Sequence, residues 1–411
     1  MQVPAPPEWS RRLLSVGVTG TNGKTSTTRW TAACLARVAR PVAQTTTLGS
    51  FLDDEPFPAA HDFGGFLATM RAGLDAGGRF CAVELTSEAL ARGFARAWPF
   101  RVGVFTNLTH DHLDAHGSPE HYLASKAQLF VALEPGATAV LNASDPASAL
   151  LAEVMPAGVR VVRYAVPSRG APDGEPELLA TSIQLGWDGT RVALARSGDL
   201  AGAPEALHVR AVGEIYAENA LAALAASMAA GVPAADAARA LAEAPVPRGR
   251  FEVVSGEAAP RTVVDYAHSP DALARTVATA RRLCTGSLVV VFGAGGDRDR
   301  DKRGPMGEAA SGADRVVLTS DNPRSEDPAR IADAIRAGID PRVQVRIELD
   351  RRAAIRAAIL DAEEDDVVLI AGKGHETQQT IAGQTRPFDD AAEARAALRE
   401  RSGASSRPSS T

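Results

Sequence analysis

Aromatic side chains, cysteines and long apolar runs are scarce in this chain of 411 residues. Aromatic residues make up only 5%, too few for a platform on which nucleic-acid bases stack. The three cysteines, Cys34, Cys81 and Cys284, are odd in number and far apart, which excludes a disulfide framework and a four-thiolate zinc site and indicates a reducing cytoplasm. No apolar run reaches the roughly 18 residues of a transmembrane helix, and the first residues lack the pattern of a signal peptide.

Basic residues are also outnumbered by acidic ones, with 44 lysines and arginines against 50 aspartates and glutamates. The formal net charge is −6 and the isoelectric point about 5.8, whereas non-specific nucleic-acid or anionic-membrane binders are normally basic. We therefore expect no nucleic-acid partner and no membrane partner. The content of 45% hydrophobic and 23% charged residues is typical of a globular protein. Because a single core rarely grows beyond about 250–300 residues, the length predicts more than one domain.

The first half of the chain repeats a strand–loop–helix pattern. Short apolar runs that end in polar residues occupy residues 13–18, 80–85, 102–106 and 137–142, and a helical pattern follows the first of them. These runs predict buried strands of a parallel sheet. Residues 159–208 are interrupted by glycine and proline, and we interpret them as a small antiparallel β insertion.

A domain boundary is expected where Pro245, Pro247 and Gly249 interrupt the helical pattern. Four further apolar runs follow at residues 262–266, 288–292, 315–318 and 366–370, and they predict a second open parallel sheet. The expected organisation is α/β, with a P-loop ATPase-type domain over residues 1–246, a Rossmann-like domain over residues 247–400, and a disordered Ser/Pro-rich tail over residues 401–411.

The sharpest local signal is a glycine-rich loop between the first strand and the first helix. Its glycines allow backbone N–H groups to face phosphate oxygens, and the helix dipole adds to the attraction. Lys24 would contact the outer phosphates and Thr25 would bind Mg²⁺. Val18 stands where the strict pattern has glycine, so an ordinary strand-to-helix turn is the alternative. The predicted ATP-binding residues are Gly20, Thr21, Asn22, Gly23, Lys24 and Thr25.

Two further polar groups follow neighbouring strands. Glu84 ends one strand and His112 lies after the next, so both are expected near Thr25 at one edge of the sheet. Histidine is an unusual companion for Mg²⁺, which prefers oxygen ligands. The alternatives are a zinc cluster or polar loop residues, formed by His110, His112, His116 and His121.

Several separate motifs, in order and spanning nearly the whole chain, resemble those of the Mur ligases. They lie at residues 20–25, 106–108, 111–114, 126, 247–252, 265–272, 295–299, 321–324 and 372–376. The sequence is most similar to the MurE type, which joins a diamino acid to UDP-N-acetylmuramoyl-dipeptide. The resemblance implies that ATP phosphorylates a carboxylate and that an amine attacks the resulting acyl phosphate.

The resemblance also implies roles for four residues of the first domain. Lys24 would hold the phosphates, while Glu84 and His112 would bind Mg²⁺. Lys126 matches a lysine that members of the family carbamylate, which would let it orient a second Mg²⁺; the alternative is a surface lysine on a helix.

Further residues match substrate contacts of the family. Asn219, Arg250 and Asp265 match nucleotide contacts, with a helix cap, a hinge salt bridge and a strand-end carboxylate as alternatives. Arg324 would grip a carboxylate of the added amino acid and Glu376 its ammonium; a plain turn and a solvated loop are the alternatives. The implied amino-acid contacts are Arg298, Asp321, Asn322, Arg324, Gly372 and Glu376.

The acceptor end departs from the family pattern. Only residues 1–12 precede the first strand, so the uridine-binding domain of the family is not expected. The Thr-Thr segment of the family is absent from residues 58–65, and Glu88 stands where the family tends to have histidine. These departures favour a carboxylate smaller than the UDP-muramoyl peptide, with His61, Asp62 and Glu88 as candidate contacts, unless these face solvent.

We therefore expect a cytoplasmic, ATP- and Mg²⁺-dependent ligase that joins an amino acid to a non-UDP carboxylate, as a monomer or small homo-oligomer. One alternative is cell-wall tripeptide synthesis without an N-terminal domain of its own. Another is a silent ATP-binding scaffold, which the joint presence of Lys24, Glu84, His112 and Lys126 disfavours.

Overall fold

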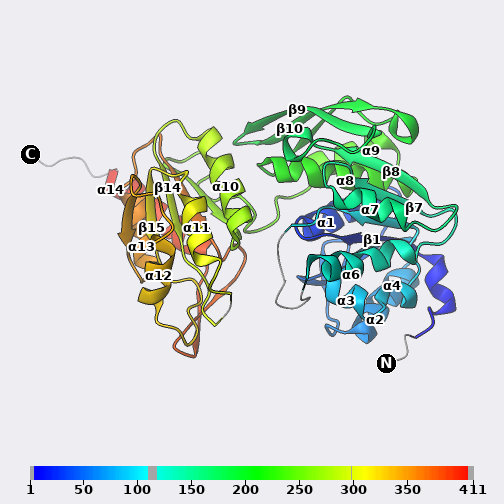
Figure 1. The fold of residues 1–411 in the computed structure, drawn as a ribbon, viewed down its shortest axis with the longest axis horizontal. Helices are drawn as coiled ribbons and strands as arrows, with labels where there is room; N and C mark the ends of the chain where they lie inside the picture. Colours follow the sequence, from blue (N-terminus) through cyan, green and yellow to red (C-terminus); the bar gives the residue numbers. More distant parts are fainter. Residues whose placement is uncertain (1–3, 110–117, 298, 406–411) are drawn as a thin grey trace, which may run out of the picture. The chain divides into compact units, whose positions relative to one another are not determined.

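The computed structural model describes residues 4–109, 118–297 and 299–405 (Figure 1). The chain forms two compact units, one of residues 1–184, 189–210 and 214–244, the other of residues 185–188, 211–213 and 245–411. The main division, after residue 244, lies two residues before the boundary expected from the sequence. Two predicted site residues, His112 and Arg298, lie outside the described residues. Within the described ranges, no helix has the length and apolar character needed to cross a membrane.

The N-terminal unit is built on one sheet in which parallel β1 lies between β5 and β6. Nearly every residue of these three strands is buried, because helices cover the sheet on both faces. In sheet order the strands are β11 (Ala206–Val209), β10 (Gly189–Arg196), β9 (Leu178–Gly186), β8 (Arg160–Ala165), β7 (Thr138–Asn142), β6 (Val102–Phe105), β1 (Leu14–Thr19), β5 (Phe80–Glu84), β2 (Val42–Thr46), β3 (Gly49–Leu52) and β4 (Glu55–Phe57).

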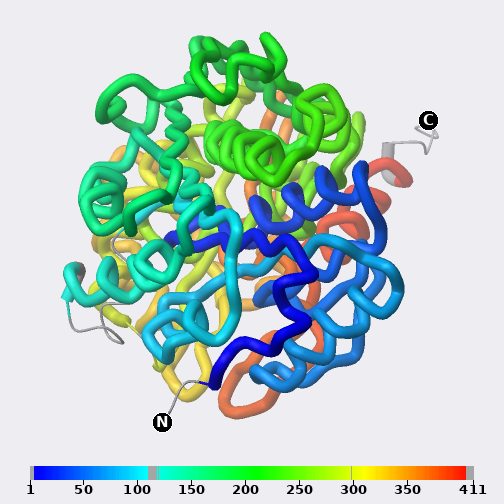
Figure 2. The backbone as a smooth tube through the Cα atoms, turned by 90° about the vertical axis from the view of Figure 1, so that its right-hand side faces the viewer, coloured from blue at the N-terminus to red at the C-terminus, as the bar shows by residue number. Residues whose placement is uncertain are grey.

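Two groups of helices cover this sheet, with α1, α8 and α9 on one side and α2, α3, α4 and α6 on the other (Figure 1). Figure 2 shows the blue turns of α1 beside the green turns of α8, which is rich in alanine and therefore packs closely. The helices of this unit are α1 (Lys24–Leu35), α2 (Phe63–Asp75), α3 (Ser87–Ala91), α4 (Phe94–Ala97), α6 (Pro119–Val131), α7 (Ala147–Glu153), α8 (Glu214–Ala229) and α9 (Ala234–Glu243), with 3₁₀ turns at Glu8–Arg12, Pro167–Arg169 and Gly198–Leu200.

The segment predicted as a small antiparallel insertion differs from that expectation. β8 pairs in parallel with both β7 and β9, so the segment extends the main sheet instead of forming a separate one. Antiparallel pairing is found between β10 and β11. Short alternating stretches specify which face of a strand is buried but not the direction of its neighbour, which explains the error.

The C-terminal unit contains the second parallel sheet that the apolar runs predict. β17 lies between β13 and β14, all parallel, and only the short edge strand β12 runs antiparallel to its neighbour. In sheet order the strands are β12 (Glu252–Val253), β13 (Arg261–Asp265), β17 (Val367–Ala371), β14 (Leu288–Phe292), β15 (Arg315–Leu318) and β16 (Gln344–Ile347), and β18 (Gln378–Ile381) pairs with β19 (Gln384–Pro387). The helices are α10 (Pro270–Leu283), α11 (Arg303–Ala310), α12 (Pro328–Arg336), α13 (Arg351–Leu360) and α14 (Asp390–Ser405).

The start of the predicted disordered tail is helical. α14 continues to Ser405, so residues 401–405 belong to a helix. The Arg401 guanidinium donates hydrogen bonds to the carbonyls of Ile359 and Leu360 at 3.1 and 3.0 Å, which ties this end of α14 to the end of α13. Composition alone could not reveal these long-range contacts.

The three cysteines are free thiols. Burial raises the pKa of Cys34 and of Cys81 to about 12. Both thiols are therefore protonated and poorly reactive at neutral pH, as expected for small buried side chains. Cys284 is only partly buried, and burial raises its pKa as well.

A fully buried ion pair joins α13 to α14. Arg351 donates to both carboxylate oxygens of Asp390 at 2.7 Å and to the carbonyl of Ala371 at 2.9 Å, and neither charged side chain is exposed. Burial opposes the guanidinium charge, but Asp390 outweighs this effect and raises the pKa of Arg351.

Replacing Arg351 by methionine is expected to lower the free energy of unfolding by about 3–5 kcal/mol, because Asp390 would remain buried without its partner. The matched control is Arg352→Met, which removes a largely exposed arginine from the 2.8 Å ion pair with Glu393 and should cost less than about 1 kcal/mol. Urea unfolding of both variants measures the difference, and equal losses would contradict this assignment.

Candidate active site

Two glycines shape the loop between β1 and α1. Gly20 has a φ of +148° and Gly23 a φ of +83°, in the region that favours glycine. A Cβ atom at Gly20 would lie 1.9 Å from Thr106 Oγ1, and one at Gly23 would lie 2.1 Å from Asn219 Oδ1. Both positions therefore require glycine for reasons of space as well as backbone conformation.

The residues that follow β6 hold this loop in place. The Thr21 N–H donates to the Asn107 carbonyl at 2.7 Å, and the Asn22 N–H donates to Asn107 Oδ1 at 2.9 Å. Thr106 Oγ1 donates to the Asn22 carbonyl at 2.7 Å. Asn107 is thus a supporting residue; it lies within the motif at residues 106–108 but is not among the site residues predicted from the sequence.

The first turn of α1 carries Lys24 and Thr25. Gly23 is the residue that precedes the helix, so the backbone N–H groups of the first turn have no partner within the helix. Lys24 Nζ donates to the Thr21 carbonyl at 2.7 Å, which places the ammonium against the loop. This combination of helix N-terminus, glycine loop and lysine is a suitable site for phosphate groups.

The Glu84 carboxylate lies beside Thr25, as predicted from the two strand ends. Thr25 Oγ1 donates to Glu84 Oε2 at 2.8 Å, and the Thr47 N–H donates to the same oxygen at 3.1 Å. Glu84 is buried. The sequence reasoning missed Thr47, which lies in the turn between β2 and β3, 37 residues from its partner.

The oxygen donors at this point fit Mg²⁺. The Thr25 hydroxyl and the Glu84 carboxylate are hard ligands, and a phosphate-bound Mg²⁺ needs only one or two groups from the protein. In the described part of the chain, no group of three His, Cys, Asp or Glu residues is arranged as a metal cluster. Because His110, His112 and His116 lie outside this part, their roles remain predictions.

Lys126 is buried beneath the phosphate loop. Lys126 lies on α6 and is 1% exposed. Its Nζ donates a hydrogen bond to the Gly20 carbonyl at 2.7 Å. The ammonium also lies 4.0 Å from the ring centroid of Tyr122. The alternative of a surface lysine is therefore wrong, whereas carbamylation of Lys126 remains a prediction.

Asn219 projects from the interior of α8 toward the phosphate loop. It is 1% exposed, and its Oδ1 has no hydrogen-bond partner among the described residues. Because Asn219 is the sixth residue of α8, the alternative of a helix cap is wrong. A buried amide oxygen without a partner is costly, and a ligand that donates a hydrogen bond would satisfy it.

Two predicted nucleotide contacts, Arg250 and Asp265, lie in the C-terminal unit and have different surroundings. The Arg250 guanidinium lies 4.4 Å from the ring centroid of Tyr266, and together they form a flat cationic and aromatic surface. Asp265 accepts hydrogen bonds from the N–H groups of Phe251 at 2.6 Å and Ala267 at 2.8 Å. Burial raises the pKa of Asp265, although the charge of Arg250 and these N–H groups oppose the rise. Asp265 therefore supports the loops around it, and its contact with a nucleotide stays a prediction.

A small pocket in the C-terminal unit brings together three predicted amino-acid contacts. Asn322, Arg324 and Glu376 line this cavity of about 270 Å³ with residues of the 377–380 segment. It therefore presents one cation and one anion. Asp321 and Gly372 do not line it: Asp321 is buried, and a Cβ at Gly372 would lie 2.6 Å from Asp321 Oδ2.

Lys373, which the sequence reasoning did not assign, holds the anion of this pocket. It is 0% exposed, and its Nζ donates to Glu376 Oε2 at 2.8 Å. Asn322 Nδ2 donates to the same oxygen at 2.9 Å. Burial alone would raise the pKa of Glu376, but Lys373 and Asn322 outweigh it and lower the pKa below its ordinary value.

A larger cavity, of about 570 Å³, lies against Glu84 in the N-terminal unit. It brings together His61 and Asp62, two of the three candidate acceptor contacts, with Glu84 and the 45–47 segment. Asp62 also caps α2 by accepting from the Gly65 N–H at 2.8 Å. Glu88 is not among the lining residues; it is exposed and pairs with Arg92 at 2.5 Å.

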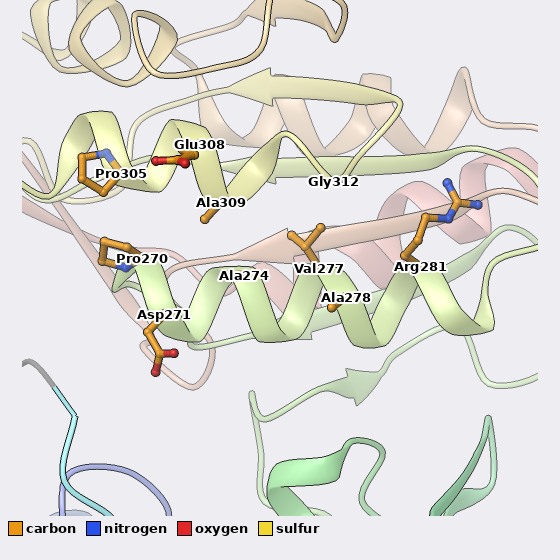
Figure 3. A pocket seen from close by; sticks show the side chains of 10 residues that line it. All are labelled: Pro270, Asp271, Ala274, Val277, Ala278, Arg281, Pro305, Glu308, Ala309 and Gly312. Atoms are coloured by element: carbon orange, nitrogen blue, oxygen red, sulfur yellow. The ribbon is translucent and has the colours of Figure 1, made fainter. Parts of the chain in front are cut away.

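A third hollow, of about 650 Å³, separates α10 from α11 (Figure 3). Its walls are mainly small or apolar residues, such as Ala274, Val277, Pro305 and Ala309. None of the predicted site residues lines it. It is therefore a groove distinct from the two cavities that hold candidate substrate contacts.

The chain belongs to the Mur ligase family. The Mur ligase middle domain matches residues 18–227, and the domain described as "Mur ligase, glutamate ligase domain" matches residues 249–374. These matches agree with the α/β fold of both units and with the position of the phosphate loop. Members of this family are ATP-dependent amide ligases that form ADP, and the chain is an enzyme of this class.

Within the family, the chain is similar to proteins named UDP-N-acetylmuramoyl-L-alanyl-D-glutamate–2,6-diaminopimelate ligase. The protein from Thermosynechococcus vestitus is 42% identical over 95% of this chain and 78% of its own length, and that from Ralstonia nicotianae is 41% identical over 95% and 76%. A solved structure of a ligase with this name is 32% identical, with a TM-score of 0.69, and covers 95% of this chain and 79% of that one. The Mycobacterium tuberculosis folylpolyglutamate synthase, 23% identical with a TM-score of 0.69 over 95% and 92% of the two chains, shares the fold.

Proposed function

We propose that this enzyme phosphorylates an acceptor carboxylate with ATP and joins the carboxyl group to the amino group of 2,6-diaminopimelate or of an amino acid with a similar distal end. The main support is the position of Glu84. Its carboxylate accepts a hydrogen bond from Thr25 of the phosphate loop at 2.8 Å and also lines the 570 Å³ cavity. A phosphoryl donor and a carboxylate can therefore meet at Glu84.

The proposed reaction has two steps. An oxygen of the acceptor carboxylate attacks the γ-phosphorus of ATP, the bond to the bridging oxygen breaks, and ADP leaves. The neutral amine of the amino acid then attacks the acyl carbon, phosphate leaves, and the nitrogen loses a proton to solvent. Both steps depend mainly on positioning and on stabilisation of negative charge.

Different residues of the N-terminal unit have different roles in this proposed reaction. Lys24 and the first turn of α1 bind the outer phosphates, Asn219 accepts a hydrogen bond from the nucleotide, and Lys126 fixes the Gly20 carbonyl. Thr25 and Glu84 would hold Mg²⁺, with His112 as a further predicted ligand. Mg²⁺ neutralises charge on the phosphates when it is bound. Arg250 and Tyr266 of the C-terminal unit offer a surface that suits a nucleotide base.

The 270 Å³ cavity suits the distal end of the added amino acid. Diaminopimelate carries an ammonium and a carboxylate at this end, and the cavity presents the Glu376 carboxylate and the Arg324 guanidinium. Each charge of the ligand would thus find an opposite charge. Arg298, outside the described residues, stays a predicted contact to the same amino acid.

Replacing Lys373 by methionine is expected to raise the KM for diaminopimelate about 10-fold and to leave the KM for ATP unchanged, since Glu376 would lose a charged hydrogen-bond donor. The pH profile should also change. Only ionised Glu376 attracts an ammonium, so amino-acid binding is lost as the pH falls through the pKa of Glu376. Without Lys373 burial prevails, this pKa rises, and the loss begins at a higher pH.

Steady-state kinetics at several pH values measure both effects. Lys302→Met is the matched control, because Lys302 is a partly buried lysine of the same unit that does not line the 270 Å³ cavity, and its Nζ donates to the His268 carbonyl at 3.0 Å. An equal rise in both KM values, or an unchanged pH profile, would show that Lys373 has only a structural role.

Two acceptors are compatible with this proposal. The first is the UDP-N-acetylmuramoyl dipeptide in the names of the curated relatives, supported by 42% identity across 95% of the chain. The second is a smaller carboxylate without UDP, for which the departure at residues 58–65 is the argument; Glu88 gives no support, because it is exposed and does not line the cavity. Both use the same phosphate loop, so the test must vary the acceptor.

The proposal is tested by measuring ADP release from ATP and Mg²⁺ with diaminopimelate and a panel of carboxylates, one of them the UDP-linked dipeptide. ADP release that requires both a carboxylate and the amino acid, with an amide product in the mass spectrum, is the expected result. Nucleotide binding without such release from any acceptor of the panel would contradict the proposed pair of substrates.

A further inference from the structure

Two loops at one edge of the C-terminal sheet approach each other closely. One follows β14 and contains Gly296 and Asp297, and the other follows β15 and contains Arg324 of the 270 Å³ cavity. A Cβ atom at Gly296 would lie 2.0 Å from the Pro323 carbonyl oxygen, and the Gly296 N–H donates to the Asn322 carbonyl at 2.9 Å. Open α/β sheets bind their ligands at the carboxyl ends of the strands, so contacts between these loops affect the amino-acid site.

Each loop contains a non-glycine residue with a left-handed backbone. Asp297 has a φ of +54° and Arg324 a φ of +53°, a conformation that residues other than glycine adopt rarely. Such residues persist where the surrounding contacts hold them, and they are concentrated at binding sites. The contacts that hold these two residues therefore indicate how the cavity is positioned.

Asp297 is joined to the neighbouring loop through both its backbone and its side chain. Its N–H donates to Glu326 Oε1 at 2.6 Å. Its carboxylate accepts hydrogen bonds from the N–H and the hydroxyl of Ser325, at 3.0 and 2.7 Å. Because donors and acceptors lie on both loops, neither loop can shift along the other without breaking a hydrogen bond.

The Glu326 carboxylate is itself fixed by a buried arginine. Arg303, the first residue of α11, donates from Nη2 to Glu326 Oε1 at 2.9 Å, and the two side chains are only 6% and 14% exposed. Arg300 lies 3.3 Å from the other carboxylate oxygen. Charge-assisted hydrogen bonds of this kind are stronger than neutral ones, so Glu326 provides a firm acceptor for the Asp297 N–H.

The cation of the cavity contacts the same loop. The Arg324 guanidinium donates to the Gly296 carbonyl, whose carbon is bonded to the Asp297 nitrogen. Glu326 is not among the described residues that line the cavity. Any influence of Glu326 on a ligand in the cavity must therefore pass through this loop to Arg324.

We infer that Glu326 is a positioning residue of the amino-acid site. By holding the Asp297 N–H it fixes the Gly296 carbonyl, which orients the Arg324 guanidinium toward a carboxylate of the added amino acid. The inference rests on the proposed function, because that function assigns the 270 Å³ cavity to the amino acid.

Glu326→Ala is expected to raise the KM for diaminopimelate about 10-fold and to leave the KM for ATP unchanged, since Arg324 would lose its fixed orientation. Glu326→Gln retains an oxygen that can accept from the Asp297 N–H, so it should restore most of the affinity. Glu308→Ala, which removes an exposed glutamate of α11, is the matched control and should change neither KM. Steady-state kinetics measure these effects, and thermal unfolding verifies that the variants fold.

A double substitution tests whether Glu326 acts through Arg324. In an Arg324→Met background, Glu326→Ala should raise the KM for diaminopimelate by less than about 2-fold, because the group that it orients is gone. A residue with a purely structural role would instead contribute the same factor in both backgrounds. Isothermal titration calorimetry with diaminopimelate, Mg²⁺ and a non-hydrolysable ATP analogue measures the same effects on binding without turnover.

The outcomes separate this inference from the proposed function. An unchanged KM for diaminopimelate in Glu326→Ala, an equal rise in both KM values, or the same factor in both backgrounds would overturn the role of Glu326 and leave the proposed function standing. If diaminopimelate binds, Glu326→Ala weakens this binding as expected and no carboxylate supports ADP release, the positioning role holds and the ligase proposal fails. If diaminopimelate neither binds nor supports turnover, both are overturned.

Discussion

Lys24→Ala is expected to lower amide-forming turnover about 1000-fold while the protein stays folded. Removing one preorganised charge from a site of phosphoryl transfer typically costs two to three orders of magnitude, about 10²–10³. Lys24 stands at the first position of α1, and its ammonium lies against the loop at 2.7 Å from the Thr21 carbonyl. Its loss removes the charge expected to stabilise the transferring phosphoryl group, so the decrease should appear in kcat as well as in the KM for ATP.

The composition of the chain provides a matched control for this variant. The sequence contains only four lysines, Lys24, Lys126, Lys302 and Lys373. Lys302→Ala, in the other unit, should retain nearly full turnover. ADP release measured for both variants, with thermal unfolding to confirm the fold, distinguishes them. Turnover within a factor of a few of the unchanged protein in Lys24→Ala would remove the phosphate loop from the proposed reaction.

Lys126→Met is expected to lower turnover at least about 100-fold. Methionine fills similar space but can neither bind the Gly20 carbonyl nor accept CO₂. Because Lys126 is 1% exposed and lies beneath the loop, its loss affects both the position of Gly20 and the proposed site of a second Mg²⁺.

Bicarbonate separates these two roles of Lys126. If the lysine acts as a carbamate, activity of the unchanged protein should fall in CO₂-depleted buffer and return when bicarbonate is added, whereas the methionine variant should not respond. Because the carbamate on Lys126 is labile, it is followed in solution by ¹³C NMR with labelled bicarbonate. Full turnover of Lys126→Met would exclude this lysine from the mechanism.

The parts of the fold that the sequence predicts best are the buried parallel strands. Residues 288–292, for example, were expected as a strand and form β14 with the same limits. Such strands are apolar on both faces, so they appear as uninterrupted runs. The sequence also predicts the glycine loop. Glycine is required at positions 20 and 23, because both have a positive φ and lie close to Thr106 and Asn219 respectively.

What the sequence could not predict depends on contacts between distant segments. Thr47 reaches Glu84 only because β2 pairs with β5, and nothing in the residues near position 47 indicates this. The role of Lys373 could not be predicted for a similar reason, because it depends on the burial of the lysine side chain next to Glu376. The burial of Lys126 likewise distinguishes it from a surface lysine only in three dimensions.

Under the proposed function, Glu84 is a common wall of two compartments, one for a nucleotide and one for an acid. Any ligand that alters the hydrogen bonds of this carboxylate on one side changes the environment on the other, so the two binding equilibria are thermodynamically linked. Linkage of this kind is reciprocal: the factor by which nucleotide changes the affinity for the acid equals the factor by which the acid changes the affinity for nucleotide. The order in which the two ligands arrive would then alter the kinetics of assembly without altering the stability of the ternary complex.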